Sequence, residues 1–241
     1  NKTKTMKNIL GFIFAFLLVI SAQAQIETFD ALLKTNVDAK GNVNYKGLKN
    51  DEAKLNTYLA YLEKTSPEKN WSASKTKAFW VNAYNAYTIK LILDNYPLKS
   101  ITKIKEKGKD AWNISFAKVG GKTYTLNHIE HEILRKDFND PKIHVGVNCA
   151  SGSCPQLGNF AFTEANYEAK TDELMKKFIN DSNRNKISAK KIQISKIFEW
   201  FKGDFTKEGS LIDFLNKYSD TKIKKNAKII FLEYDWSLNG K

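Results

Sequence analysis

One cysteine and two histidines are the side chains best suited to covalent chemistry. Cys149 opens a segment of small residues, 149–155 (CASGSCP), directly after a run of mostly apolar residues. A thiol attacks a carbonyl carbon as its thiolate, and near neutral pH a base or cation must lie beside it to favour that form. His131 or His144 could supply the base. The pattern therefore makes Cys149 a candidate nucleophile.

The small residues that follow Cys149 could bind a developing negative charge. A strand that ends in such a turn can present backbone N–H groups, the donors of an oxyanion site. We expect Ser151 and Gly152 to belong to this turn. A phosphatase-type phosphate cradle is excluded, because it needs an arginine six positions after the cysteine, where the sequence has Pro155.

The second cysteine, Cys154, leaves the redox state of the pair open. In an exported protein two cysteines most simply form one disulfide that closes a short loop, and Cys149 would then not be a nucleophile at rest. Thiol–disulfide exchange is a third interpretation. The spacing is Cys-x4-Cys, however, and not the Cys-x2-Cys that would favour exchange.

A further group of titratable residues occupies 127–135 (NHIEHEILR). His131 and Arg135 are four residues apart and so share one helical face, and Glu130 could orient the His131 ring. His128 and His131 raise the question of a metal site. Neither HExxH nor HxxEH is present, and no second cysteine pair completes a zinc site, so we expect no metal and no cofactor.

Two asparagines lie within an apolar stretch, 79–86 (FWVNAYNA). Asn82 and Asn85 are three residues apart and share a helical face. A buried carboxamide needs hydrogen-bonding partners. These two side chains could position a catalytic group or hold a substrate carbonyl, or they could satisfy the backbone of a nearby loop. Both interpretations stay open.

The elements that position these residues predict an α+β fold. Hydrophobic spacing predicts helices over 29–35, 48–62, 74–95, 162–180, 194–205 and 211–218. Ser72 can cap the third helix, which Pro97 ends, and Asn127 with Glu130 forms an approximate capping box for a short helix. Extended pieces are expected around a Gly-Asn turn in 37–45, strands over 143–148 and 228–234, and a charged loop over 103–122. We expect a helix-rich single domain around a small, mostly antiparallel sheet.

The N-terminal residues predict export. Met6-Lys7 precedes an uncharged apolar run, 9–20, and the small residues of 21–24 (SAQA) follow, which is the order of a secretory signal peptide. The run is shorter than the roughly 20 residues of a spanning helix. We expect 1–24 to be removed, 25–241 to form one domain in the periplasm or outside the cell, and no later segment to span a membrane. Gln25 stands where a lipoprotein would need cysteine.

The basic charge does not indicate a nucleic-acid partner. The formal net charge is +13, and +10 without Lys2, Lys4 and Lys7. Nearly all of this charge is lysine spread along the chain, whereas readers of phosphates and base edges favour arginine forks. We expect a small-molecule or peptide ligand and no nucleic acid.

Three blocks resemble the signature segments of the domain-of-unknown-function 547 family: FWVNAYNAYTIKLILDNYP, TLNHIEHEILR and IHVGVNCASGSCPQL. The likeness extends over nearly all of 25–241, with a signature core at about 72–180. Plant members often lack the second cysteine, which implies that Cys149, ahead of Cys154, is the main site residue, with Cys154 in a binding or positioning role. His128 departs from the family, which more often has an acidic residue there. The resemblance implies one common site that includes Asn82, Asn85, Glu130, His131, Arg135 and His144.

Two functions from different classes follow. The first is a thiol-dependent hydrolase or acyl transferase acting on peptide or cell-envelope amides. Cys149 would attack the carbonyl, His131 would act as base and then acid, and Glu130 or an asparagine would orient the imidazole. The alternative is a module that binds a ligand or partner without catalysis and keeps a structural Cys149–Cys154 disulfide. A thiol–disulfide redox protein is the third choice.

Overall fold

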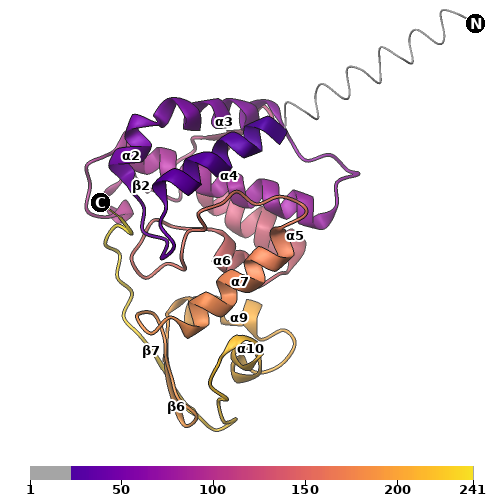
Figure 1. The fold of residues 1–241 in the computed structure, drawn as a ribbon, viewed down its shortest axis with the longest axis vertical. Helices are drawn as coiled ribbons and strands as arrows, with labels where there is room; N and C mark the ends of the chain where they lie inside the picture. Colours follow the sequence, from indigo (N-terminus) through magenta and orange to yellow (C-terminus); the bar gives the residue numbers. More distant parts are fainter. Residues whose placement is uncertain (1–22, 241) are drawn as a thin grey trace, which may run out of the picture.

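One long helix, α4 (Ala73–Asp94), lies at the centre of the fold. Its apolar residues cover every face, and a helix of that kind has to be buried all round; most of its residues from Lys77 to Leu93 are buried. The helix begins as expected, because the Ser72 side chain accepts a hydrogen bond from the Lys75 backbone N–H. In Figure 1, α3 and a helix over 23–36 lie above α4, and α7 lies below it.

The structure, a computed structural model, describes residues 23–240. The predicted signal peptide therefore lies outside the described residues except for its last two positions, which begin the 23–36 helix. The other helices, in chain order, are α2 (Tyr45–Asn50), α3 (Glu52–Lys64), η1 (Ile101–Lys103), η2 (His128–Arg135), α5 (Lys136–Phe138), α6 (Ile143–Gly146), α7 (Tyr167–Asn180), α8 (Ile197–Trp200), α9 (Lys202–Phe205) and α10 (Leu211–Tyr218).

The strands form three small sheets and not the single one expected. Two are antiparallel hairpins, β1 (Lys105–Glu106) with β2 (Lys109–Asp110) and β3 (Ala117–Val119) with β4 (Lys122–Tyr124). In the third sheet, β6 (Lys191–Ile194) pairs antiparallel with β5 (Lys186–Ile187) and parallel with β7 (Lys228–Phe231), with Lys191 opposite Lys228. The predicted helix-rich α+β class is confirmed.

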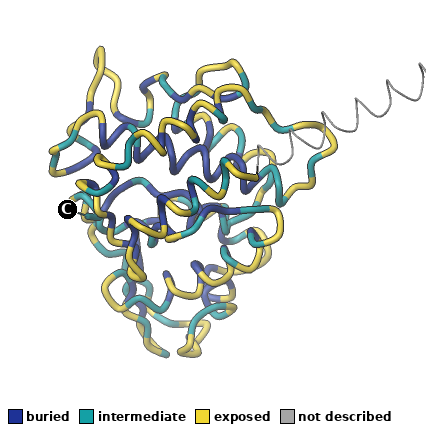
Figure 2. The backbone as a smooth tube through the Cα atoms, turned by 45° about the horizontal axis from the view of Figure 1, so that its top comes forward, coloured by how far each residue is buried: buried dark blue, intermediate teal, exposed yellow. Residues whose placement is uncertain are grey.

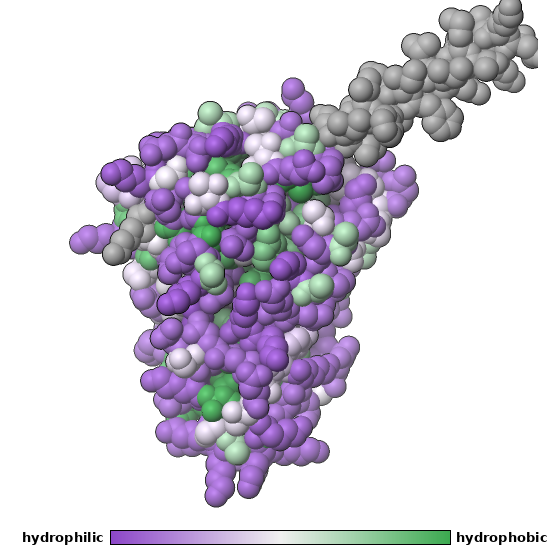
Figure 3. All heavy atoms as spheres, viewed as in Figure 1, coloured by the Kyte–Doolittle hydropathy of each residue, from purple (hydrophilic) through white to green (hydrophobic). Residues whose placement is uncertain are grey.

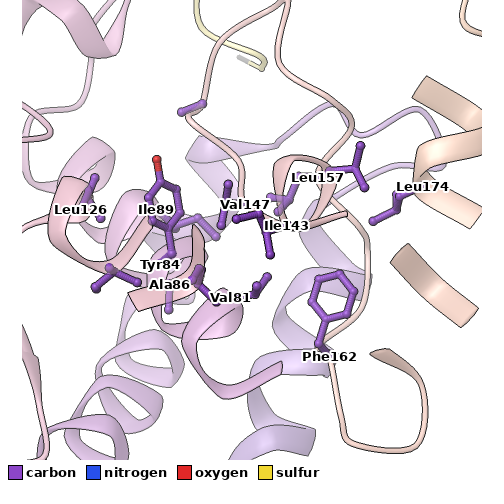
Figure 4. Packing of buried hydrophobic residues seen from close by; sticks show 14 of the residues in the cluster. Val81, Tyr84, Ala86, Ile89, Leu126, Ile143, Val147, Leu157, Phe162 and Leu174 are labelled. Atoms are coloured by element: carbon purple, nitrogen blue, oxygen red, sulfur yellow. The ribbon is translucent and has the colours of Figure 1, made fainter. Parts of the chain in front are cut away.

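A continuous hydrophobic core joins these elements. Figure 2 shows the buried residues running through the middle of the molecule. Figure 4 shows side chains of α4, among them Val81 and Tyr84, in the same core as Leu126 ahead of η2, Ile143 of α6 and Leu174 of α7. The face seen in Figure 3 is mostly hydrophilic, with small apolar patches. Between residues 23 and 240, no helix is both long and apolar enough to cross a bilayer.

The C-terminal segment joins the two ends of the fold. After β7 it runs back along the side of the molecule towards α2 (Figure 1). Leu238 N–H donates to the Lys99 carbonyl at 2.9 Å, and Val43 N–H donates to the Asn239 carbonyl at 3.1 Å. This return path carries the residues from 232 onward past the cysteine-bearing turn.

The predicted strand over 143–148 is wrong, because the segment forms the single helical turn α6 and becomes extended only at Val147. The Asp140 side chain accepts the Lys142 N–H at 2.9 Å and starts that turn. A short apolar run cannot be assigned to strand or helix from periodicity alone. Here the run packs against α4 and pairs with no strand.

Several other predicted boundaries change. The segment 103–122 carries β1, β2 and β3 instead of forming an irregular loop, and α7 begins at Tyr167, five residues later than expected. The 194–205 helix is two short helices, α8 and α9, that follow the end of β6. The residue that caps the helix leading into η2 is Thr125, whose Oγ1 accepts the His128 N–H at 2.9 Å; Asn127 makes no such cap.

Candidate functional site

A cavity of about 170 Å³ collects most of the titratable residues singled out from the sequence. It lies where α4, η2, α6, α8, the turn that carries the cysteines and the C-terminal segment meet. Among the predicted site residues, five line it: Glu130, His131, His144, Cys149 and Cys154. The remaining walls are mainly aromatic, formed by Tyr84, Trp112, Trp200, Phe201, Tyr234 and Trp236, with Asn127, Val147 and Ile197.

The Cys149 thiol is partly exposed and surrounded by hydrogen-bonding groups. Its Sγ lies 3.2 Å from the Ser151 hydroxyl and 3.4 Å from the Tyr234 hydroxyl, which in turn accepts a hydrogen bond from Ser151. Hydrogen bonding to the Cys154 thiol, followed by Ser151 and Tyr234, lowers the pKa of Cys149 to about 6 against the opposing effect of burial. Donors that surround a sulfur favour its thiolate. Cys149 is therefore ionised near neutral pH without a histidine beside it.

Both cysteines are free thiols and do not lie at disulfide distance. Instead, the Cys149 backbone N–H donates to Cys154 Sγ at 3.2 Å. Burial raises the pKa of the Cys154 thiol, which stays protonated. In this structure Cys154 is thus a hydrogen-bonding partner of Cys149, and the expected disulfide is absent.

Apart from that of Ser151, the backbone N–H groups of the cysteine turn (residues 148–155) already have acceptors within the protein. Gly152 N–H donates to the Ser237 carbonyl at 2.7 Å, and Ser153 N–H donates to the Asp235 carbonyl at 3.1 Å. A Cβ at Gly152 would lie 2.9 Å from an Asp235 carboxylate oxygen and 3.2 Å from the Ser237 hydroxyl, so a larger residue there would have to displace these two side chains. Gly152 supports this contact and offers no free donor to an oxyanion.

A strained residue follows Cys149. Ala150 has a φ of +59°, a left-handed conformation that L-residues other than glycine seldom adopt. Its N–H donates to the Asn148 side chain at 2.9 Å, and the Asn148 amide donates to the Pro155 carbonyl at 2.8 Å. Arg184 closes the other side by donating to the Cys154 and Gly152 carbonyls. Strain held by such contacts is characteristic of functional turns.

Glu130 is a buried carboxyl group that faces the cavity. Burial, and then the Cys149 charge, raise its pKa to about 7, while a hydrogen bond from the Tyr84 hydroxyl and the charge of Arg135 limit the rise. A carboxyl group with a pKa near 7 can both donate and accept a proton at neutral pH. Its geometry fits proton transfer better than the orienting role expected from the sequence, because its hydrogen-bonding partner is Tyr84.

His131 is held in one tautomer by Arg135. Arg135 Nη1 lies 3.2 Å from Nδ1 of His131, and a guanidinium can only donate, so Nδ1 accepts and the neutral ring carries its proton on Nε2. Burial, and then the Arg135 charge, lower the pKa of His131, so the ring is neutral at pH 7. No hydrogen bond joins His131 to Cys149 within residues 23–240. The neutral ring therefore offers an Nε2–H hydrogen-bond donor, whereas the sequence suggested a base.

Asp204 links the two histidines from outside the predicted set. Its Oδ2 accepts Arg135 Nε at 2.7 Å and His144 Nε2 at 2.8 Å. Phe201 stacks on the His144 ring at 4.2 Å and lies under the Arg135 guanidinium at 4.8 Å. These contacts fix Arg135, and through it the His131 ring.

The two asparagines bind backbone groups and do not line the cavity. Asn82 exchanges two hydrogen bonds with the backbone of Phe162, at 2.7 and 2.9 Å. Asn85 donates to the Gly146 carbonyl at 2.9 Å and accepts the Asn148 N–H at 2.8 Å. Asn85 thereby ties the segment that leads into the cysteine turn to α4. Both carboxamides position chain segments and neither faces the cavity.

The site residues that no sequence pattern indicated come from segments far from Cys149 in the chain. Tyr84 was hidden in the apolar pattern of α4, and Asp204, Tyr234 and Trp236 lie more than 50 residues beyond Cys149. Arg135 was the one signal in the sequence for Asp204, because a partly buried guanidinium requires an acidic partner. Within the described residues no group of three or more metal-ligating side chains is positioned to hold an ion.

Comparison with known proteins gives a family and no activity. Residues 68–179 match the family model described as "Protein of unknown function, DUF547". This range contains α4, η2 and the cysteine turn. Neither the curated proteins nor the solved structures contain a match.

Proposed function

The chain belongs to the DUF547 family, whose description assigns no activity, and from the geometry of the cavity we propose that it is a cysteine-dependent hydrolase or acyl transferase. The observation that carries this proposal is the partly exposed Cys149 thiol, whose pKa of about 6 makes it a thiolate at neutral pH. Glu130, with a pKa of about 7, lines the same cavity. A nucleophile and a proton-transfer group matched to neutral pH form the minimal set for acyl transfer.

The reaction proceeds through a thioester. The Cys149 thiolate attacks the carbonyl carbon of an amide or ester, a C–S bond forms, and the carbonyl electrons move to oxygen. The proton on His131 Nε2 can stabilise that oxyanion, since Nδ1 is occupied by Arg135. When the tetrahedral species collapses, the bond to the leaving group breaks and protonated Glu130 gives its proton to the departing amine or alcohol.

Water or another acceptor completes the cycle. Glu130, now a carboxylate, takes a proton from the acceptor as it attacks the thioester, and the C–S bond breaks to return the Cys149 thiolate. The substrates expected from the sequence, peptide or cell-envelope amides, belong to this proposal, as does a location in the periplasm or outside the cell. A cavity of about 170 Å³ admits a small acyl or side-chain group and not a whole polymer.

An activated ester tests the proposal directly. Incubation with p-nitrophenyl acetate should give a burst of p-nitrophenolate and an acetyl group on Cys149, detected by peptide mass spectrometry. Cys149→Ala should abolish both. Cys154→Ala shows which thiol reacts: the acetyl group should still form on Cys149, although more slowly at pH 7, because loss of the Cys154 thiol raises the pKa of Cys149. If Cys149 stays unmodified while the folded protein is intact, the non-catalytic binding interpretation replaces this one.

A further inference from the structure

Four aromatic side chains gather at the entrance of the cavity, and we call them the aromatic mouth: Trp112, Trp200, Tyr234 and Trp236. Trp112 and Trp236 meet edge to face at 5.5 Å, and Tyr234 lies 4.6 Å from Trp236 and 4.8 Å from Trp200, measured between ring centroids. They come from three separate parts of the chain. Residues that are far apart in the sequence thus become neighbours at this cavity.

Trp200 is the member that most needs an explanation. Among the described residues it is the one large hydrophobic side chain classed as exposed, with 45% of its surface accessible. Core packing does not account for an indole ring that is partly exposed to solvent. A tryptophan at the rim of a cavity has a face available for a ligand.

The charges inside the cavity are negative. Cys149 and Glu130 are the ionisable acids among the lining residues, and no lysine or arginine lines it. Burial lowers the pKa of both His131 and His144, which keeps the rings neutral. Arg135, which contacts His131 from behind, is paired with Asp204 at 2.7 Å. An anionic ligand would meet the Cys149 thiolate, and Glu130 in its ionised form, without a compensating cation.

An uncharged polar ligand such as a sugar finds few free partners at this entrance. The Asn127 amide donates to Asn113 at 2.9 Å, and the Tyr234 hydroxyl is engaged with Ser151 and Cys149. What the cavity offers is aromatic faces around a negative interior. Aromatic faces attract organic cations through the ring quadrupole, and tryptophan does so most strongly.

We propose that the aromatic mouth binds an organic cation, so that the substrate carries an alkylammonium or quaternary ammonium group beside its reacting carbonyl. This inference rests on the proposed function and names its substrate class. The cavity volume suits a group of that size. Trp200, Tyr234 and Trp236 lie outside the matched family range of 68–179, whereas Cys149, Glu130 and His131 lie inside it. The proposed chemistry thus lies within the matched range, whereas three of the four residues of the aromatic mouth, all but Trp112, lie in the segment that follows.

A pair of isosteric probes tests the inference. Choline and its neutral analogue 3,3-dimethyl-1-butanol have nearly the same shape and differ in charge. Three of the five tryptophans of the chain line the cavity, so intrinsic fluorescence reports binding. We expect choline to change the fluorescence saturably and to slow alkylation of Cys149 by iodoacetamide, and the neutral analogue to bind about fivefold or more weakly.

Substitutions of Trp200 test whether choline binds at the aromatic mouth. Trp200→Leu should weaken choline binding about fivefold, Trp200→Phe should restore part of it, and Trp71→Leu, which changes a tryptophan outside the cavity, should leave it unchanged. Equal binding of the two probes, no saturable change, or a Trp200→Leu variant that binds like the parent would overturn the inference. Both properties are measured in the parent protein. Absence of acylation by p-nitrophenyl acetate together with choline binding would count against the enzyme alone, and acylation without choline binding would count against the cation alone.

Discussion

Arg135 Nη1 lies 3.2 Å from Nδ1 of His131, and the same guanidinium donates through Nε to Asp204. This contact decides which nitrogen of the ring faces the cavity with a proton. It also places a positive charge beside an imidazole that is already partly buried. The histidine is thereby kept neutral and turned into a hydrogen-bond donor, which is the opposite of the usual partner of a cysteine nucleophile.

Arg135→Met should raise the pKa of His131. Burial remains, but the like charge that disfavours the imidazolium is removed. The measurement is a proton NMR titration of the ring, which is easily assigned because the chain has three histidines and His128 is exposed. Lys136→Met removes a charge from the neighbouring exposed residue and should leave the pKa of His131 unchanged. An unchanged His131 pKa in Arg135→Met would refute the assigned contact.

Glu130→Gln should remove a pH-dependent part of the stability. The pKa of Glu130 is about 7 in the folded chain and 4.5 ordinarily, so between these values the folded state keeps a proton that the unfolded state releases. Stability from this group is present below pH 4.5 and is lost as the pH rises to 7, by about 3 kcal/mol in total. Glutamine has no such titration and can still accept from Tyr84.

Urea unfolding at several pH values measures this difference. The free energy of unfolding of Glu130→Gln, relative to the parent, should increase by about 3 kcal/mol from pH 4.5 to pH 8. Glu132→Gln, on the exposed side of the same helix, is the matched control and should follow the parent curve. A constant difference across the pH range would show that Glu130 titrates as an ordinary carboxyl group.

The parts of the fold that were predictable carry their own local signals. α4 is apolar on every face and has a serine cap, and α10 has the predicted bounds together with a capping box at Ser210 and Asp213. The segment 143–148 misled because its branched residues resemble a strand, whereas Asn85 holds its end against a helix through two backbone hydrogen bonds. Tertiary contacts of this kind override propensity.

The site residues, too, include some that were predictable from the sequence and some that were not. Glu130 and His131 are adjacent in one helix, and η2 is wound as a π-helix, a form often found at functional sites. Their grouping with Cys149 could be inferred from residue type and resemblance. Asp204 and Tyr234 could not, because a single acid or a single tyrosine has no spacing signal, and only the return of the C-terminal segment brings Tyr234 to the sulfur.

Cys154→Ala should make Cys149 less acidic. The Cys154 thiol is the largest contributor to the lowered pKa of Cys149, so its loss should move the pH midpoint of iodoacetamide alkylation upward from about 6. Cys154→Ser keeps a hydroxyl donor and should move the midpoint less. Tyr234→Phe removes a weaker donor and should also raise it. A midpoint that stays near 6 in Cys154→Ala would show that the second thiol does not stabilise the first.

Asn85→Ala and Asn82→Ala form a matched pair that separates support of the fold from support of the site. Each substitution leaves one buried backbone carbonyl and one buried N–H without a partner, at Gly146 and Asn148 for Asn85 and at Phe162 for Asn82. Each unpaired group costs about 1–3 kcal/mol, so both variants should lose about 2–6 kcal/mol of unfolding free energy in urea. The two losses should be similar, because both asparagines lie buried in α4 and make the same kind of contact.

Only Asn85→Ala should alter the thiol. Asn85 fixes the segment that enters the cysteine turn, and its loss lets Cys149 move away from the Tyr234 and Ser151 hydroxyls, which raises the pKa of the thiol and slows alkylation at pH 7. Asn82→Ala should alkylate at the parental rate under conditions where both variants are folded. Equal reactivity of the two variants would mean that the turn is held by Asn148 and Arg184 alone, and that Asn85 supports only the packing of α6 on α4.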